Sequence, residues 1–161
     1  MRLAAALAFG LLLSACGQQP AEKSADAPAA DAAPAAAAAL TPQEIANALV
    51  ALPEPYNTGD YEAGRRVFAQ CRSCHTITAD NANRIGPHLH GLWGRASGHV
   101  EDFRYSDAMR NAALTWDGPT LDRYLTNPRE TVPGTTMVFP GVRDETQRRN
   151  LIAYLAVESQ R

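Results

Sequence analysis

The sequence predicts an all-α fold of short helices joined by long loops. Three segments place apolar side chains at helical spacing: residues 60–70, 119–126 and 144–159. The stretch 76–103 has few apolar periods and several Gly and Asn residues, so we expect it to be loop. No segment shows the apolar–polar alternation of a half-buried strand.

Each of the three helices has an inward face that the spacing defines. The first runs from Asp60 to Gln70, the second from Pro119 to Thr126, and the third from Asp144 or Glu145 to Ser159. The expected inward residues are Gly64, Val67 and Phe68, then Leu121, Tyr124 and Leu125, then Leu151, Ile152 and Leu155.

A further short helix is expected before these three, in residues 41–57. Thr41 is a capping residue, Pro42 suits the first helical position, and Glu44 completes a capping box. Ile45, Leu49 and Leu52 follow at helical spacing before Pro53 stops the helix. This extension packs on the main domain, fills the linker, or binds a partner; the sequence leaves the three open.

Composition excludes one broad class of function. The 161 residues suffice for one domain plus some non-globular sequence. Fifteen basic and seventeen acidic residues give a formal net charge of -2, without a long run of either sign. A nucleic-acid partner is therefore not indicated.

The first 40 residues have the features of an export signal and a tether. Arg2 precedes an apolar run at 3–13, which is too short to span a bilayer but suits a signal-peptide core. Leu13-Ser14-Ala15-Cys16 resembles a bacterial lipobox, which predicts cleavage after residue 15 and acylation of Cys16. The alternative is an ordinary signal cut after Ala15 that leaves a bare thiol. The Ala- and Pro-rich stretch up to residue 40 then reads as a linker.

The other two cysteines form the motif that carries chemistry. Cys71-Arg72-Ser73-Cys74-His75 is the C-x-x-C-H signature of covalent c-type haem attachment. Two thiols three positions apart on a helical turn reach the two vinyl groups of one porphyrin, and His75 then falls under the iron as an axial ligand. A thioredoxin-like dithiol needs a βαβ setting, and a zinc site needs a second ligand pair; the sequence offers neither.

A thioether is the expected second axial ligand of an electron-transfer haem. Two methionines follow the haem motif, Met109 and Met137. Met109 falls in a helix-like turn and is expected to pack in the core. Met137 falls in the segment 127–141, whose three prolines and two glycines predict a stiff loop without regular structure. We therefore expect Met137 to be the ligand.

From Gly64 to Leu155 the chain resembles class I cytochrome c of the mitochondrial and alphaproteobacterial type. The resemblance implies the cytochrome c fold, with short helices and long loops around one covalent haem c. Together with the features of the first 57 residues described above, the resemblance divides the chain into a lipoprotein-type signal peptide (1–15), a lipid-anchored linker (16–40), a helical extension (41–57) and a cytochrome c domain (58–161). The matching stretches include 64–68, 71–75, 86–95, 105–108, 114–116, 124–128, 133–137 and 151–155.

The resemblance also implies roles for individual residues. The Pro87 carbonyl would accept a hydrogen bond from His75 and so fix its ring. Tyr105, Trp116 and Arg95 would contact or neutralise the haem propionates. Tyr124 and Thr135 would surround the methionine sulfur and the inner propionate. One departure concerns Met109, which stands where the family usually has a polar asparagine near the haem.

The expected function is that of a monomeric electron carrier, not an enzyme. The resemblance implies a quinol–cytochrome c reductase as donor and a terminal cytochrome c oxidase as acceptor, on the periplasmic side of a bacterial membrane. Whether the inner or the outer membrane holds the anchor stays open. The alternatives are a ligand-binding or peroxidase-like haem protein, which needs an open sixth position, and a thiol-redox module.

Overall fold

The computed structural model describes residues 39–79 and 82–161, so the expected signal peptide, Cys16 and most of the linker lie outside it. Within the described residues the chain forms helices and loops, and the only strand-like pairing is an isolated bridge between Ala96 and Thr115. The predicted all-α class is confirmed. The elements are α1 (Pro42–Val50), a 3₁₀ helix η1 (Tyr56–Thr58), α2 (Tyr61–Phe68), α3 (Asp107–Arg110), α4 (Gly118–Thr126), α5 (Pro128–Thr131) and α6 (Glu145–Glu158).

Side-chain caps fix where the longer helices begin. In each case a short polar side chain accepts a hydrogen bond from a backbone N–H that has no partner inside the helix. α1 has the full capping box between Thr41 and Glu44. The other three caps are Asp60 to the Ala63 N–H of α2, Asp117 to the Thr120 N–H of α4, and Asp144 to the Gln147 N–H of α6.

The crossing of α2 and α6 forms the centre of the core. Gly64 lies so close to α6 that a Cβ there would sit 2.1 Å from the Asn150 carbonyl oxygen and 2.7 Å from Tyr154 Cβ. Phe68 and Tyr154 pack with ring centroids 5.2 Å apart. Gly64, which was expected on the inward face, thus lets these two helices approach each other closely.

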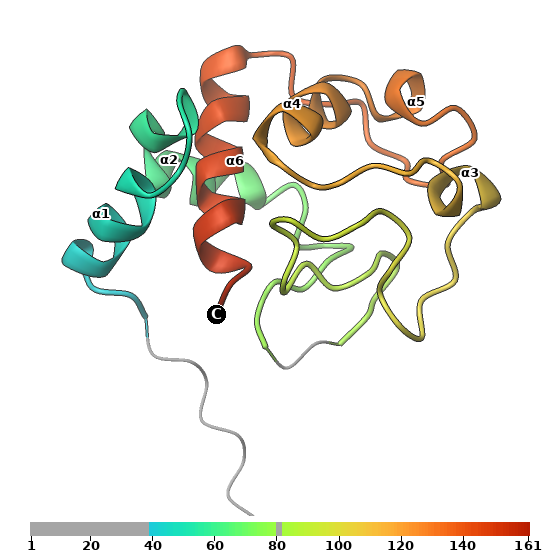
Figure 1. Cartoon of the computed structure of the whole chain (residues 1–161), viewed down its shortest axis with the longest axis horizontal. Helices are drawn as coiled ribbons and strands as arrows, with labels where there is room; N and C mark the ends of the chain where they lie inside the picture. Colours follow the sequence, from blue (N-terminus) through green and yellow to red (C-terminus); the bar gives the residue numbers. More distant parts are fainter. Residues whose placement is uncertain (1–38, 80–81) are drawn as a thin grey trace, which may run out of the picture. The chain divides into compact units, whose positions relative to one another are not determined.

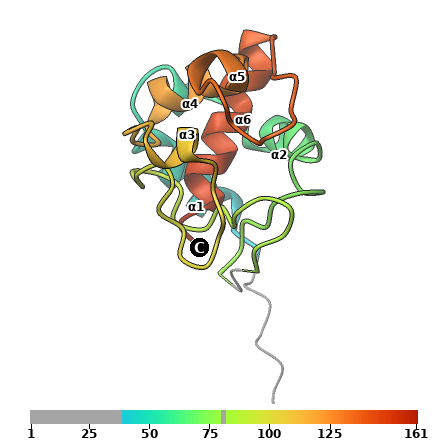
Figure 2. The same cartoon turned by 90° about the vertical axis from the view of Figure 1, so that its right-hand side faces the viewer.

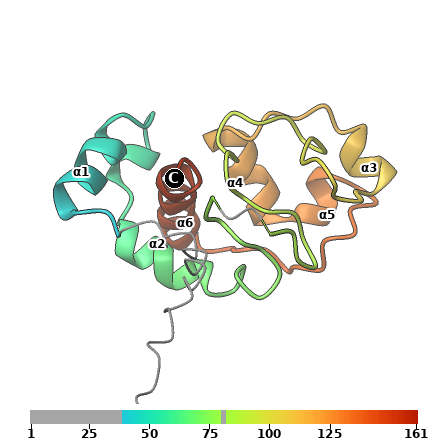
Figure 3. The same cartoon turned by 90° about the horizontal axis from the view of Figure 1, so that it is seen from below.

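α6 stands between two groups of elements. α1 lies on one side of it, and α3, α4 and α5 lie on the other with the long loops (Figures 1 and 3). A quarter turn shows the loops 76–79 and 82–103 gathered below α3 and α4 (Figure 2). The functional cavity lies on this second side, because its walls come from α3, α4, the loops and Leu155 of α6.

Two details of the sequence prediction were wrong. The segment 127–141 was expected to lack regular structure, yet it begins with the helical turn α5. Pro128 occupies the first turn of α5, where its missing N–H leaves no helical hydrogen bond unmade. α1 ends at Val50, before Leu52, although the Leu52 side chain still packs against the core.

The extension before α2 packs on the main domain. Leu40, Ile45, Leu49 and Leu52 are partly buried against the core. Of the three possibilities left open by the sequence, the structure thus shows packing on the domain. Among the helices of the described residues, none has both the length and the apolar character needed to cross a membrane.

Candidate haem-binding site

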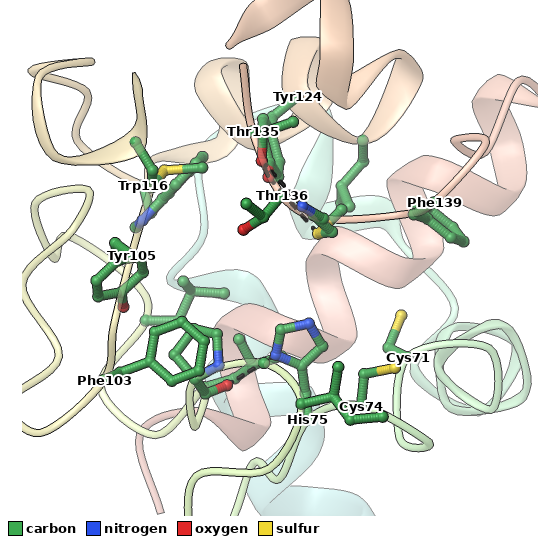
Figure 4. Close-up of a pocket in the computed structure, with 18 of the residues that line it drawn as sticks. Cys71, Cys74, His75, Phe103, Tyr105, Trp116, Tyr124, Thr135, Thr136 and Phe139 are labelled. Carbon is green, nitrogen blue, oxygen red and sulfur yellow. Dashed lines mark hydrogen bonds between the residues drawn. The ribbon is translucent and has the colours of Figure 1, made fainter. Parts of the chain in front are cut away.

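A cavity of about 260 Å³ collects nearly all the side chains singled out in the sequence. Cys71, Cys74 and His75 lie at one end, and Tyr105 and Trp116 lie at the other (Figure 4). The walls between them are mostly apolar and include Ile85, Leu89, Leu92, Phe103, Met109, Leu121, Leu125, Val138, Phe139 and Leu155.

The two thiols sit on a helical turn that continues from α2. The Cys71 N–H donates to the Phe68 carbonyl at 2.8 Å, and the His75 N–H donates to the Cys71 carbonyl at 3.0 Å. Burial, and then the neighbouring Cys74, raise the pKa of Cys71 to about 11. A thiol with such a pKa is protonated at neutral pH, unlike the reactive thiolate of a redox dithiol. The thiol-redox alternative is therefore disfavoured.

The His75 ring is held in one orientation. Its Nδ1 lies 2.7 Å from the Pro87 carbonyl oxygen. A carbonyl only accepts, so Nδ1 carries the proton and Nε2 keeps a free lone pair. Burial lowers the pKa of His75, and the hydrogen bond to Pro87 opposes this in part. The ring is therefore neutral and ready to bind a metal ion.

Gly86 is needed for this arrangement. A Cβ at position 86 would lie 2.3 Å from His75 Cε1 and 2.8 Å from Nε2. Only a residue without a side chain lets the backbone pass so close behind the imidazole. The Gly86 N–H also donates to the Cys74 carbonyl at 2.9 Å, which ties the loop to the haem motif.

Three hydrogen bonds enclose the Met137 thioether in a cycle. The Met137 N–H donates to Thr135 Oγ1 at 3.3 Å, and Thr135 Oγ1 lies 3.4 Å from the Tyr124 hydroxyl. The Tyr124 hydroxyl donates to Met137 Sδ at 3.5 Å. Because the phenol has one proton, Thr135 is the donor in the middle bond. Burial raises the pKa of Tyr124, so the phenol keeps this proton at neutral pH.

Met109 also lines the cavity, as a 7% exposed residue of the short helix α3. Its N–H is capped by Ser106 Oγ at 3.2 Å. The expectation of core packing holds, but the structure brings both methionines to the same cavity. What distinguishes Met137 is the hydrogen bond that its sulfur receives from Tyr124.

Polar groups gather at the end of the cavity away from the cysteines. Arg95 donates to the carbonyls of His90 at 2.7 Å and His88 at 3.1 Å, which aligns its guanidinium beside the cavity. Burial raises the pKa of Tyr105, and the positive charge of Arg95 opposes this. The residues present thus fit a haem: two thiols at one end, a free imidazole nitrogen, apolar walls, and donors for carboxylates at the other end.

Several lining residues had no signal in the sequence. Phe103 and Phe139 lie in loops, where no periodicity marks an inward position. Gly86 opens the matching stretch 86–95, but the sequence assigned it no role at the site. The exposed apolar residues Ile85 and Val138 at the cavity were missed for the same reason. Leu121, Leu125 and Leu155 were expected to be buried by helical spacing, but spacing alone does not distinguish a cofactor from other core residues.

Known proteins resemble this chain over the part that forms the cavity. Residues 61–157 match the family described as Cytochrome c. Cytochrome c of Gibberella zeae is 46% identical over 98 residues, which cover 60% of this chain and 92% of the relative. Cytochrome c2 of Rhodoblastus acidophilus is 47% identical over 98 residues, with 61% and 92% covered. The structure of cytochrome cH from Methylobacterium extorquens matches with a TM-score of 0.57 at 41% identity, covering 60% of this chain and 97% of that one.

Proposed function

The chain belongs to the cytochrome c family, and from this premise we propose that it passes electrons one at a time from a quinol–cytochrome c reductase to a terminal cytochrome c oxidase. As a class I cytochrome c it is an electron carrier, not an enzyme, and carries one covalent haem c. The observation that supports the proposal most is the cavity with Cys71, Cys74 and His75 on its wall and Met137 held beside it.

We propose that His75 and Met137 are the two axial ligands. When bound, the haem supplies an iron that alternates between the ferrous and ferric states. His75 presents Nε2 while Pro87 holds its Nδ1 proton. The hydrogen bond from Tyr124 orients the Met137 sulfur and withdraws electron density from it. With two protein ligands, the haem iron would keep no coordination position for a substrate. An electron carrier needs no such position, whereas a peroxidase-like protein does.

Arg95, Tyr105 and Trp116 are proposed to hold the haem carboxylates. A carboxylate in a mostly apolar cavity is costly unless it is paired and hydrogen-bonded. A guanidinium, a phenol and an indole supply one charge and several donors at that end of the cavity. Tyr124 and Thr135 would stay with the methionine sulfur, as their closed set of hydrogen bonds suggests.

The cavity edge near Ile85 and Val138 is the proposed docking surface for both partners. These side chains are 81% and 86% exposed, although both are large and apolar. Exposed apolar side chains at a functional opening are typical of an interaction site. Electron transfer needs close approach rather than a tight complex, and a small apolar contact suits brief encounters.

Attachment to the membrane through Cys16 is a separate proposal, which rests on the sequence alone. A Cys16→Ser variant should lose its lipid, while any exported protein should still carry haem, because the haem motif lies elsewhere in the chain. Mass spectrometry of the wild-type protein tests the claim. An unmodified Cys16 thiol on protein found free in the periplasmic fraction would refute it.

The visible spectrum of the purified protein, together with a redox titration, tests the function. Covalent haem, a low-spin ferric iron and reversible one-electron reduction are expected. Reduction by a quinol–cytochrome c reductase and oxidation by a cytochrome c oxidase should then be measured with membranes of the source cell. Rapid binding of azide or peroxide to the unmodified ferric protein would instead favour a ligand-binding haem protein.

A further inference from the structure

Tyr56 lies before the residues that match the family, yet it is buried in the core. It belongs to η1, and only 5% of its surface is exposed. The family match begins at residue 61. The Tyr56 ring therefore comes from the extension that precedes the matched residues.

The Tyr56 ring packs directly against the backbone where α4 begins. A Cβ added at Gly118 would lie 2.1 Å from Tyr56 Cε2, 2.6 Å from Cδ2 and 2.9 Å from Cζ. The ring also meets Trp93 edge-on, with centroids 6.5 Å apart and planes at 75°. Tyr56 thus contacts two segments of the main domain at once.

These two segments are hydrogen-bonded to each other and carry the polar end of the cavity. The Gly94 N–H donates to the Trp116 carbonyl at 3.0 Å, and the Trp116 N–H donates to the Arg95 carbonyl at 2.9 Å. Arg95 and Trp116 both line the cavity. We call residues 93–95 and 116–118 the back wall. Tyr56 touches this wall at Trp93 and Gly118, whereas the side chains of Arg95 and Trp116 reach the cavity.

Hydrogen bonds and close packing hold the segment around Tyr56 in place. The Tyr56 N–H donates to the Pro53 carbonyl at 3.0 Å, and the Gly59 N–H donates to the Tyr56 carbonyl at 3.0 Å. A Cβ at Gly59 would lie 2.5 Å from Ala153 Cβ, so the chain after η1 is packed tightly on α6. The segment that carries the ring is thus held on α6, while the ring itself contacts the back wall.

From these contacts we infer that Tyr56 is a positioning residue for the haem: it holds the back wall so that Arg95 and Trp116 stay aimed at the haem carboxylates. The inference rests on the proposed roles of Arg95 and Trp116. If Tyr56 acts in this way, the extension (residues 41–57) influences the haem site and does more than connect the domain to the linker. Looser donors would leave the carboxylates less compensated, which favours the ferric iron and lowers the reduction potential.

The first test compares two buried tyrosines in the full-length holoprotein. Tyr56→Ala removes the ring behind the back wall, whereas Tyr61→Ala removes a 9% exposed ring that packs on α6 against Tyr154. Amide hydrogen exchange at Gly94 and Trp116 should accelerate by about tenfold or more in Tyr56→Ala only, because local opening becomes easier there. The reduction potential should fall in Tyr56→Ala, stay near wild type in Tyr61→Ala, and be restored in Tyr56→Phe. Equal exchange and equal potentials in the two alanine variants would overturn the inference.

A second test needs no large cavity and keeps the inference open to refutation if Tyr56→Ala does not fold. Gly118→Ala should disturb the back wall from the other side, since its new Cβ meets the Tyr56 ring. Pairing it with Tyr56→Leu should bring exchange at Gly94 and Trp116 back toward wild type. Additive effects of the two changes would show that the ring and the wall are not coupled. The exchange rates report on the back wall alone. A failure of the proposed function would instead appear in the visible spectrum of the wild-type protein, so the two failures can be distinguished.

Discussion

At the scale of single residues, the Met137 sulfur belongs to a closed set of hydrogen bonds. It accepts a hydrogen bond from the Tyr124 hydroxyl, which is itself bonded to Thr135 Oγ1, and Thr135 Oγ1 accepts a hydrogen bond from the Met137 N–H. Met109 also lines the cavity, but its hydrogen bond to the helix cap comes from its backbone N–H, which donates to Ser106 Oγ, and not from its sulfur. The two methionines therefore make a matched pair for mutation.

Met137→Ala should abolish the weak far-red sulfur-to-iron band, lower the reduction potential and let azide or cyanide bind readily. The reason is that the thioether stabilises the reduced iron and fills its sixth position. Visible spectroscopy and a redox titration check this. Met109→Ala is the control and should keep the band. If the control loses it and Met137→Ala retains it, the ligand has been assigned to the wrong methionine.

Gly86→Ala should disturb the His75 side of the haem more than an ordinary glycine replacement. The new Cβ would overlap the imidazole at 2.3 Å from Cε1, and such overpacking costs about 1–3 kcal/mol or more. Gly91→Ala is the control: its φ is +68°, but a Cβ there meets nothing within 4 Å. In the control, the free energy of unfolding should fall only by the backbone strain that alanine introduces there, about 1–2 kcal/mol. Denaturant unfolding gives both values, and the ferric spectrum should change in Gly86→Ala alone.

Residue chemistry was predictable where it depends on short spacing. Cys71, Cys74 and His75 are close in the chain, so their proximity follows from one helical turn. Gly86 and Tyr56 could not be found in this way. Each acts by approaching a group in another segment, His75 for Gly86 and Gly118 for Tyr56, and no local pattern encodes such a contact.

At the scale of elements, the caps decide where helices start, and the pKa of one capping carboxyl group, that of Asp117, is lowered. Asp117 accepts hydrogen bonds from Thr120, which lower the pKa of its carboxyl below the ordinary 3.8. A pKa lowered in the folded state adds stability above about pH 4, and that stability is lost as the pH falls through the folded pKa. Because α4 carries Tyr124, its start also bears on the Met137 site.

Asp117→Ala should therefore reduce the free energy of unfolding by about 1 kcal/mol at neutral pH. Asp117→Asn keeps a capping oxygen but cannot ionise. It should stay near wild type at pH 7 and show a flatter loss of stability below about pH 4. Urea unfolding at several pH values measures both effects. An acid limb in Asp117→Asn as steep as in wild type would mean that other carboxyl groups account for it.

The same caps explain why the elements were largely predictable. Thr41, Asp60, Asp117 and Asp144 are polar residues just before apolar helical spacing, and each caps the helix it was expected to start or precede. The missed helix α5 has a proline at its first turn and lies among other turn residues, so composition pointed to a loop. Such a short helix has too few residues for periodicity to be visible.

At the scale of the whole molecule, the cavity takes up interior space of the domain that side chains do not fill. Residues of α3, α4, α6 and three loop segments line it, and most of these residues are apolar. A domain of this size needs most of its apolar surface buried to be stable. The haem is thus expected to supply part of the core as well as the redox centre.

Preventing attachment should consequently unfold most of the domain. Cys71→Ser with Cys74→Ser removes both thiols but leaves every helix sequence unchanged. Far-UV circular dichroism should show a large loss of helix, because a group that binds only the folded state stabilises it. Restoring the signal by adding free haem would support this account. A fully helical haem-free double variant would contradict it.

The charge of the domain suggests how it reaches its partners. From residue 60 to 161 there are thirteen arginines, no lysine and twelve acidic residues, so the net charge is 13 - 12 = +1. Within the part of the chain that the structure describes, four arginines pair with carboxylates: Arg65 with Glu62, Arg110 with Asp107, Arg148 with Asp122 and Arg161 with Glu158. Long-range attraction to acidic partners is therefore expected to be modest, so proximity from another source would matter for docking.

A lipid on Cys16 and the linker to residue 40 would provide that proximity. Tethering can hold the domain near membrane partners at an effective concentration approaching about millimolar, without any steering charge. Association that relies on charge weakens steeply with salt, because the Debye length falls to about 8 Å at 0.15 M. We therefore expect salt to depress turnover of a membrane-embedded oxidase strongly with soluble residues 41–161 and only weakly with the lipidated chain in the same membrane. Oxygen consumption measured over a range of salt concentrations makes the comparison, and equal rates with equal salt dependence would show that the anchor contributes nothing to docking.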